Sequence, residues 1–322
     1  MQRILIAFVA CGLSLSFGSA AQGVMTTTFQ VTGNVGYELV GFAQPGQTSV
    51  SGNVQLMTVP PTATILNALV YTNDFLAPPP GGGPNGGGGW LDGTITDPSL
   101  VPSSLGVNVA PTSQDPGSAL VFGYQFGAAG AITTTGQYSI NLTASFAGGN
   151  PGQMHGAALL VIYQDATLPV TTITVNDGVQ YLDGVAGNTN RTTTFAELTP
   201  NAIGSGTGAL SLFTLGDDPF TSGEQIKLNN QVLATNIDSN LGGGGGSASL
   251  YNFDALNASA ITTVGGGGNT VELTSTGDVY SWSVAVLQSP VPEPSTIMLA
   301  ILGLLGLLGY GRRRHRATYV LQ

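Results

Sequence analysis

The chain is built from short runs of β-branched and aromatic residues, and nearly every run is bounded by Gly, Asn, Asp or Pro. Such runs are typical of β-strands, because the turn-forming residues end them before they reach helical length. Helical periodicity is hard to find before residue 295. The pattern therefore predicts an all-β fold, whose clearest strands are Thr64–Tyr71, Ser118–Phe126, Gln137–Phe146, Ala157–Tyr163, Thr171–Val175, Leu210–Leu215, Thr270–Leu273 and Val279–Leu287.

The pattern within the runs predicts which strand faces are buried. Gln137–Phe146 alternates apolar with polar residues, which indicates one buried and one solvated face. Val279–Leu287 repeats this alternation and is expected to lie in a packed sheet, through Tyr280, Trp282, Val284 and Val286. Ala157–Tyr163 is apolar without alternation, so we interpret it as a central strand covered on both faces. A short buried helix fits the same run.

Turn residues suggest how the strands are connected. Asn176-Asp177-Gly178 offers residues that tolerate positive φ, so a tight hairpin is predicted directly after Thr171–Val175. Three glycine-rich stretches lack the sequence of a phosphate-binding loop and are interpreted as long connections: Pro78–Gly89, Gly242–Gly246 and Gly265–Gly268. Residues 22–290 are therefore expected to form one large antiparallel β-sandwich, jelly-roll-like in type, or two closely packed ones.

The N-terminus resembles a secretory signal peptide over residues 1–21. Arg3 supplies the positive end, an apolar stretch follows, and small residues predict cleavage after Ala20 or Ala21. An uncleaved anchor and a lipoprotein cut before Cys11 are the alternatives. Because Cys11 is the single cysteine of the chain, cleavage at Ala20 or Ala21 leaves a mature protein without disulfides, thiolate nucleophiles or cysteine metal ligands. Exported proteins without cysteine are more typical of bacteria than of animals.

The charge of the predicted body excludes some partners. Between Gln22 and Pro290 only Arg191 and Lys227 are basic, against 16 Asp and Glu, which gives a net charge of −14. Nucleic-acid binding requires clustered Lys and Arg, so no nucleic-acid partner is expected. Binding to anionic membranes is disfavoured for the same reason, whereas cation binding is permitted.

Residues for catalysis are scarce in the body. Its one histidine, His155, lies before an apolar strand without a nucleophile elbow, and too few nitrogen or sulfur ligands exist for zinc. Asp217-Asp218 and Asn176-Asp177 offer oxygens to calcium, but no Asp-x-Asp-x-Asp run is present, and turn formation is the simpler interpretation. Paired carboxylates for sugar cleavage lack a recognisable setting. We expect a protein that is not an enzyme and needs no cofactor, with calcium as the one open possibility.

The composition changes abruptly at the C-terminus. Val291-Pro292-Glu293-Pro294-Ser295-Thr296 leads into an uncharged apolar run that ends at Tyr310. A short hydrophobic helix is expected there, a little under the roughly 20 residues of a comfortable membrane span. Cations stop translocation and stay on the cytoplasmic side, which assigns this role to Arg312, Arg313, Arg314 and Arg316. A plain membrane anchor would share these properties.

The order of these three elements resembles the PEP-CTERM sorting signal of Gram-negative bacteria. The resemblance covers residues 291–316, with Val291, Pro292, Glu293 and Pro294 as the sorting motif, and leaves a short tail at 317–322. It implies recognition by an exosortase-type membrane protease and transient anchoring in the inner membrane. Removal of the tail would then transfer the body to the outer surface or the exopolysaccharide matrix.

The body resembles an uncharacterised family of bacterial and archaeal cell-surface domains. The resemblance implies a surface β-domain without site residues, and it lies in Gly156–Asp165, Leu168-Pro169, Ile173–Gly178 and Asn269–Asp278. We therefore expect a structural or adhesive protein of the cell surface or biofilm matrix. The alternative is a carbohydrate-binding or carbohydrate-active protein, which a cleft lined by two carboxylates and an exposed Trp90 would favour.

Overall fold

A computed structural model describes residues 25–76, 90–109, 112–115, 120–145, 153–184, 187, 189–196, 208–217, 223–237, 240–241, 247–256, 261 and 268–291. The strands in these residues pair antiparallel throughout, which confirms the predicted all-β sandwich class. The eight strands expected from the sequence are all found. The part of the chain described here contains no helix long and apolar enough to span a membrane.

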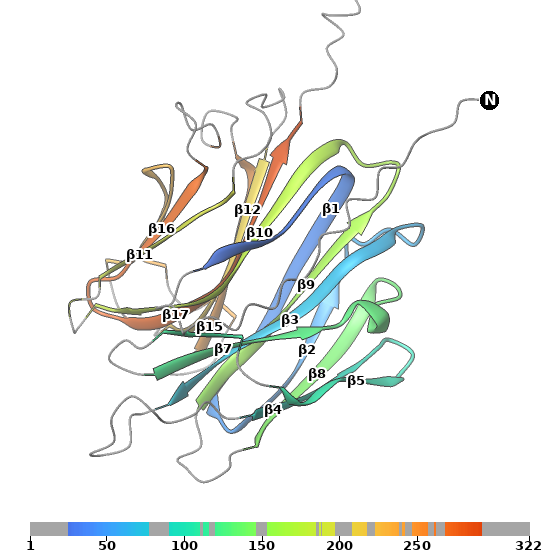
Figure 1. Ribbon diagram of the computed structural model, residues 1–322, viewed down its shortest axis with the longest axis horizontal. Helices are drawn as coiled ribbons and strands as arrows, with labels where there is room; N and C mark the ends of the chain where they lie inside the picture. Colours follow the sequence, from blue (N-terminus) through green and yellow to red (C-terminus); the bar gives the residue numbers. More distant parts are fainter. Residues whose placement is uncertain are drawn as a thin grey trace, which may run out of the picture.

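The largest sheet has nine strands in the order β15-β12-β17-β10-β1-β9-β3-β7-β6 (Figure 1). β1 is the longest of them and lies in the middle of this order. In chain order the strands are β1 (Thr26–Gln47), β3 (Thr64–Leu76), β6 (Ser113–Asp115), β7 (Leu120–Gly127), β9 (Gln153–Gln164), β10 (Val170–Asp183), β12 (Gly208–Asp217), β15 (Ser247–Leu256) and β17 (Val279–Pro290).

Two four-stranded sheets flank the large one on opposite sides (Figure 1). One has the order β2-β8-β4-β5, formed by β2 (Ser49–Leu56), β4 (Trp90–Thr96), β5 (Pro102–Val109) and β8 (Gly136–Ser145). The other has the order β11-β16-β13-β14, formed by β11 (Asn190–Thr194), β13 (Gln225–Leu228), β14 (Gln231–Thr235) and β16 (Thr270–Thr274). A short 3-10 helix, η1 (Ala129–Ala131), precedes β8.

The nine-stranded sheet folds over on itself at β1. Residues 26–34 of β1 pair with β10, whereas pairing with β9 begins at Val35. The two halves then face each other, because Phe213 of β12 and Leu160 of β9 belong to one buried cluster. A methyl group added to Gly41 of β1 would lie 3.2 Å from the Phe213 ring, which shows how closely the halves approach.

Three buried layers follow from this folding. One cluster fills the space between the β9 half of the large sheet and β2-β8-β4-β5, around Tyr138 and Phe126. A second fills the space between the β17 half and β11-β16-β13-β14, around Trp282. The third joins the two halves. Of the two architectures expected, the structure therefore has two packed sandwiches, joined through one continuous sheet.

β9 confirms the prediction for an apolar run without alternation. Leu159 and Val161 face the cluster shared with β8, whereas Leu160 and Ile162 face the cluster between the halves. β9 is a strand and not the alternative short helix. β8 confirms the alternating prediction, because Tyr138, Ile140 and Leu142 are buried while the polar residues between them face outward.

β17 departs from the simple alternation expected of it. Tyr280 and Trp282 face the same cluster as Ala285, but Val284 and Val286 face the other cluster. The reason is a bulge at Ser283, where the register with both β10 and β12 shifts. One extra residue reverses the alternation, so both faces of the strand are buried.

The hairpin predicted at Asn176-Asp177-Gly178 is wrong. β10 runs through these residues to Asp183, and its register with β17 shifts between Asp177 and Gln180. Gly178 has φ of +139°, so the glycine serves a β-bulge within a strand. A residue that tolerates positive φ fits either structure, and pairing with β1 and β17 selects the bulge.

Candidate functional site

The predicted sorting motif begins where the core ends. β17 finishes at Pro290, and the backbone N–H of Val291 donates to the carbonyl of Val170 at 3.3 Å. The chain therefore passes directly from an interior strand of the large sheet into the tail. The remaining predicted signal residues lie outside the described part of the chain: Pro292, Glu293, Pro294, Arg312, Arg313, Arg314, Arg316, Ala20 and Ala21.

A polar joint connects the two halves of the large sheet. Tyr71 of β3 donates its hydroxyl proton to Asp177 Oδ2 at 2.9 Å, and Gln125 Nε2 donates to the same oxygen at 2.9 Å. Asn73 Nδ2 donates to the Ser281 hydroxyl at 2.7 Å. Burial raises the pKa of Asp177, and the hydrogen bonds from Thr28, Tyr71 and Gln125 only partly oppose that effect. Apart from the exposed Thr28 and the half-buried Gln125, all of these side chains are buried, so the joint links the two halves mainly within the interior.

Asp74 is the most unusual ionisable group in the described residues. It lies on β3 opposite Phe122 of β7 and Met154 of β9, both buried apolar side chains. Its own exposure is 0%, and neither carboxyl oxygen has a hydrogen-bond partner in the described structure. Burial raises its pKa to about 7. The nearby carboxyl, together with burial, also raises the pKa of Tyr124.

Sequence reasoning missed Asp74, although its position carried a signal. Ala68 and Val70 are buried on the same face of β3, and a period of two places Asp74 on that face. Its carboxyl is enclosed in the apolar interior, and burial alone accounts for its raised pKa. None of the described residues lies within hydrogen-bond distance of it as an acid, base or nucleophile partner.

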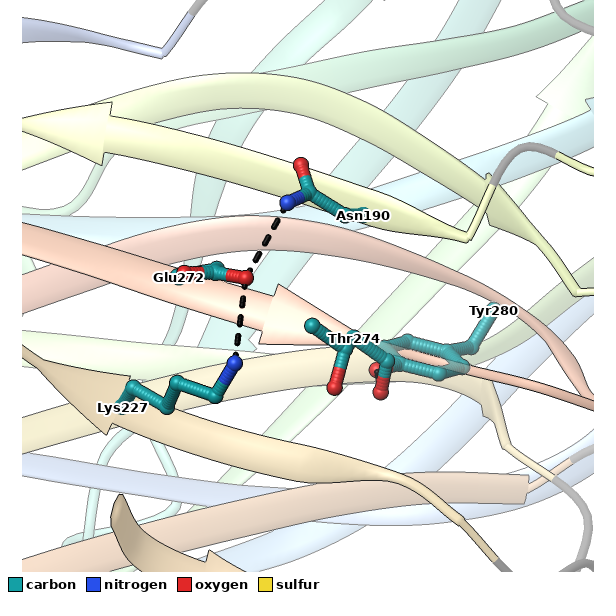
Figure 2. A network of polar contacts seen from close by, with 5 residues as sticks. All are labelled: Asn190, Lys227, Glu272, Thr274 and Tyr280. Carbon is teal, nitrogen blue, oxygen red and sulfur yellow. Dashed lines mark hydrogen bonds and ion pairs between the residues drawn. The ribbon is translucent and has the colours of Figure 1, made fainter. Parts of the chain in front are cut away.

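The outer face of β11-β16-β13-β14 carries a small ionic network (Figure 2). Glu272 Oε1 accepts from Lys227 Nζ at 3.3 Å and from Asn190 Nδ2 at 3.0 Å. Figure 2 also draws the buried Tyr280, whose hydroxyl donates to the Thr274 carbonyl at 3.2 Å. Lys227, one of only two cations expected in the mature body, therefore joins neighbouring strands.

The outer face of β2-β8-β4-β5 is polar and almost free of charge. We call it the neutral face, and its residues are Ser49, Ser51, Asn53, Gln55, Thr94, Thr96, Gln137, Ser139, Asn141 and Thr143. The Ser51 hydroxyl donates to Asn141, and the Ser139 hydroxyl donates to Asn53. Asp92 is the one charged residue at equivalent positions on β4. In a body with 16 acidic residues, this face offers donors and acceptors with little net charge.

The residues considered for chemistry are dispersed. His155 lies in β9, and the centroid of its ring is 5.1 Å from that of the Phe75 ring, in an edge-to-face arrangement. Asp217 ends β12 and Trp90 begins β4, but their side chains are not described. Across the described ranges, no three His, Cys, Asp or Glu side chains are grouped closely enough to hold a metal ion.

The tail places the protein in a known class. Residues 290–316 match the family model described as the PEP-CTERM protein-sorting motif. The protein is thus an exported protein with a C-terminal sorting signal. Its C-terminus carries a PEP-CTERM sorting motif, and such signals are processed by exosortase, a membrane protein. The resemblance of the body to a cell-surface family is not tested by this match and stays a prediction.

Three solved structures align with the chain at low sequence identity. A peptide-N(4)-(N-acetyl-β-D-glucosaminyl) asparagine amidase aligns with 10% identity over 81% of this chain and 98% of its own, with a TM-score of 0.28. The plant receptor-like kinase ANX1 aligns with 9% identity over 85% of this chain and 100% of its own. The ANX2 ectodomain from Arabidopsis thaliana aligns with 10% identity over 84% of this chain and 90% of its own. Both have a TM-score of 0.25. These scores carry no functional argument. No curated protein matches the sequence.

Proposed function

We propose that the body is a structural or adhesive component of the outer surface or biofilm matrix of a Gram-negative bacterium. In this proposal the tail anchors the chain transiently in the inner membrane, an exosortase-type protease removes it, and the body acts without catalysis or a cofactor. The observation that carries the proposal is the junction at Pro290, where a core strand meets the sorting signal directly. Removal of the tail there would leave every described strand in place.

Fractionation with intact-mass measurement tests this proposal. In the wild type we expect a product that has lost the tail and is found at the surface or in the medium. Glu293→Ala should keep the full tail and remain in the inner membrane. Thr318→Ala, which lies beyond the basic cluster, is the matched control and should behave as wild type. If wild type and Glu293→Ala both keep the tail in the inner membrane, the protein is simply anchored and the proposal is wrong.

A second candidate function is binding of matrix polysaccharide, favoured by the neutral face. Hydroxyl and amide groups on adjacent strands offer hydrogen bonds to sugar hydroxyls, and the low charge avoids a desolvation penalty. Retention on neutral dextran and on anionic alginate columns measures this binding. Asn141→Asp adds a charge at constant shape and should reduce retention on dextran. Gln231→Glu, on exposed β14, is the control and should not. Equal retention of both variants and wild type would exclude the neutral face as the binding surface.

A further inference from the structure

The last strand before the tail lies in the interior of its sheet. β17 pairs along one edge with β10, from Thr171 opposite Pro290 to Asp183 opposite Val279. Along its other edge it pairs with β12. Its two faces are covered by different apolar clusters. The strand that receives any force from the C-terminus is thus held on all four sides.

The direction of that force follows from the strand order. Tension on the tail pulls β17 along its own axis at Pro290, while β10 and β12 run antiparallel to it. Hydrogen bonds of antiparallel ladders are perpendicular to the strands. An axial pull therefore loads many bonds of both ladders together, in shear. A pull that peels β17 from its neighbours, starting at one end of the strand, would instead break the hydrogen bonds one after another.

The first strand strengthens this arrangement. β1 is also antiparallel to β10, and its Thr26 lies opposite Asp177, which in turn lies opposite Val284. β1 and β17 are therefore parallel, with β10 between them. Opposed forces on the N-terminus and the C-terminus would slide both strands along β10, and beyond Val35 β1 is held further by β9.

We propose that β17 is a load-bearing strand, which keeps the body folded when tension enters from its attached C-terminal end. The inference rests on the proposed function, in which the tail anchors the body by that end until the tail is removed. Forced unfolding is governed by the unfolding rate and not by equilibrium stability. Resistance to force should therefore depend strongly on where the chain is pulled.

Single-molecule force spectroscopy on the full exported chain, purified in mild detergent, tests this dependence. One handle follows Gln322 in all samples. The second is attached to a single cysteine, either Gln22→Cys for shear or Ala166→Cys for peeling. Ala166 is exposed in the turn before β10, and Thr171 near the start of β10 lies opposite Pro290, so this pull separates β17 from its end. The absence of other cysteines after signal cleavage makes each attachment unique.

We expect a clearly higher rupture force with the Gln22 handle than with the Ala166 handle at the same loading rate. The two proteins should have the same thermal midpoint, which shows that the fold is unchanged. Equal rupture forces, or a higher force on peeling, would overturn the inference. Because this measurement requires no exosortase, its failure is distinct from that of the sorting experiment with Glu293→Ala.

Discussion

Ionisation of Asp74 should make the stability of the body depend on pH. The pKa of this carboxyl rises from 3.8 to about 7 in the folded protein because of burial. Between those values the unfolded chain has lost the proton while the folded chain keeps it. The free energy of unfolding therefore falls as pH rises through this window, by about 1.4 kcal/mol per pH unit. Above about pH 7 it falls no further on account of this group. A rise of roughly three units gives a total of about 4 kcal/mol.

Asp74→Asn isolates this contribution, because the amide keeps the shape and does not titrate. Urea unfolding of the wild type and the variant, followed by the fluorescence of Trp90 and the buried Trp282, gives the free energy of unfolding at several pH values from 4 to 9. From pH 4 to pH 9, the free energy of unfolding of the variant should rise relative to that of the wild type by about 4 kcal/mol. Asp177, whose pKa is also raised, is present in both proteins and cancels in the difference. A difference between the two proteins that does not change with pH would refute the reasoning.

Three further substitutions and one control test the packing and the surface by urea unfolding. Trp282→Ala should cost about 3–5 kcal/mol, because the side chain is fully buried; a loss below about 1 kcal/mol would contradict the described core. Gly156→Ala should cost at least about 2 kcal/mol, because φ is +148° and the new methyl would clash with the Phe42 carbonyl oxygen. Gly127→Ala, with no atom within 4 Å of the added carbon, is its control and should be close to wild type. Lys227→Met removes a partly exposed ion pair and should change stability by less than about 1 kcal/mol; a larger loss would mean that the network on this face holds the strands together.

Local sequence patterns predicted the strands because the spacing of apolar residues in a strand shows which of its faces are buried. The alternation in β8 and the continuous apolar run in β9 correspond directly to one and two covered faces. The bulges at Gly178 and Ser283 were missed, since a one-residue shift is set by the partner strands. The fold of the sheet at β1 was missed for the same reason. Nothing local marks the step from Asn34, paired with β10, to Val35, paired with β9.

The candidate sites divide in the same way. The tail is a contiguous motif, so the sequence alone predicted the family that matches residues 290–316. Asp74 and the joint at Asp177 depend on strands far apart in the chain. Tyr71 and Asp177 are separated by 106 residues, and only the folded sheet brings them together. The neutral face likewise requires the register of β2, β8 and β4, which composition does not specify.

The central position of β17 also sets the order of events during export. A chain that crosses the inner membrane from its N-terminus delivers β10 and β12 early, each with an unpaired edge that only β17 fills. Such edges are sites of intermolecular strand pairing until they are covered. Closure of the sheet must therefore wait until Pro290 has crossed, which in the proposed function is when the sorting signal enters the membrane. If the proposed function holds, completion of folding and presentation of the signal to its protease are timed by the same few residues.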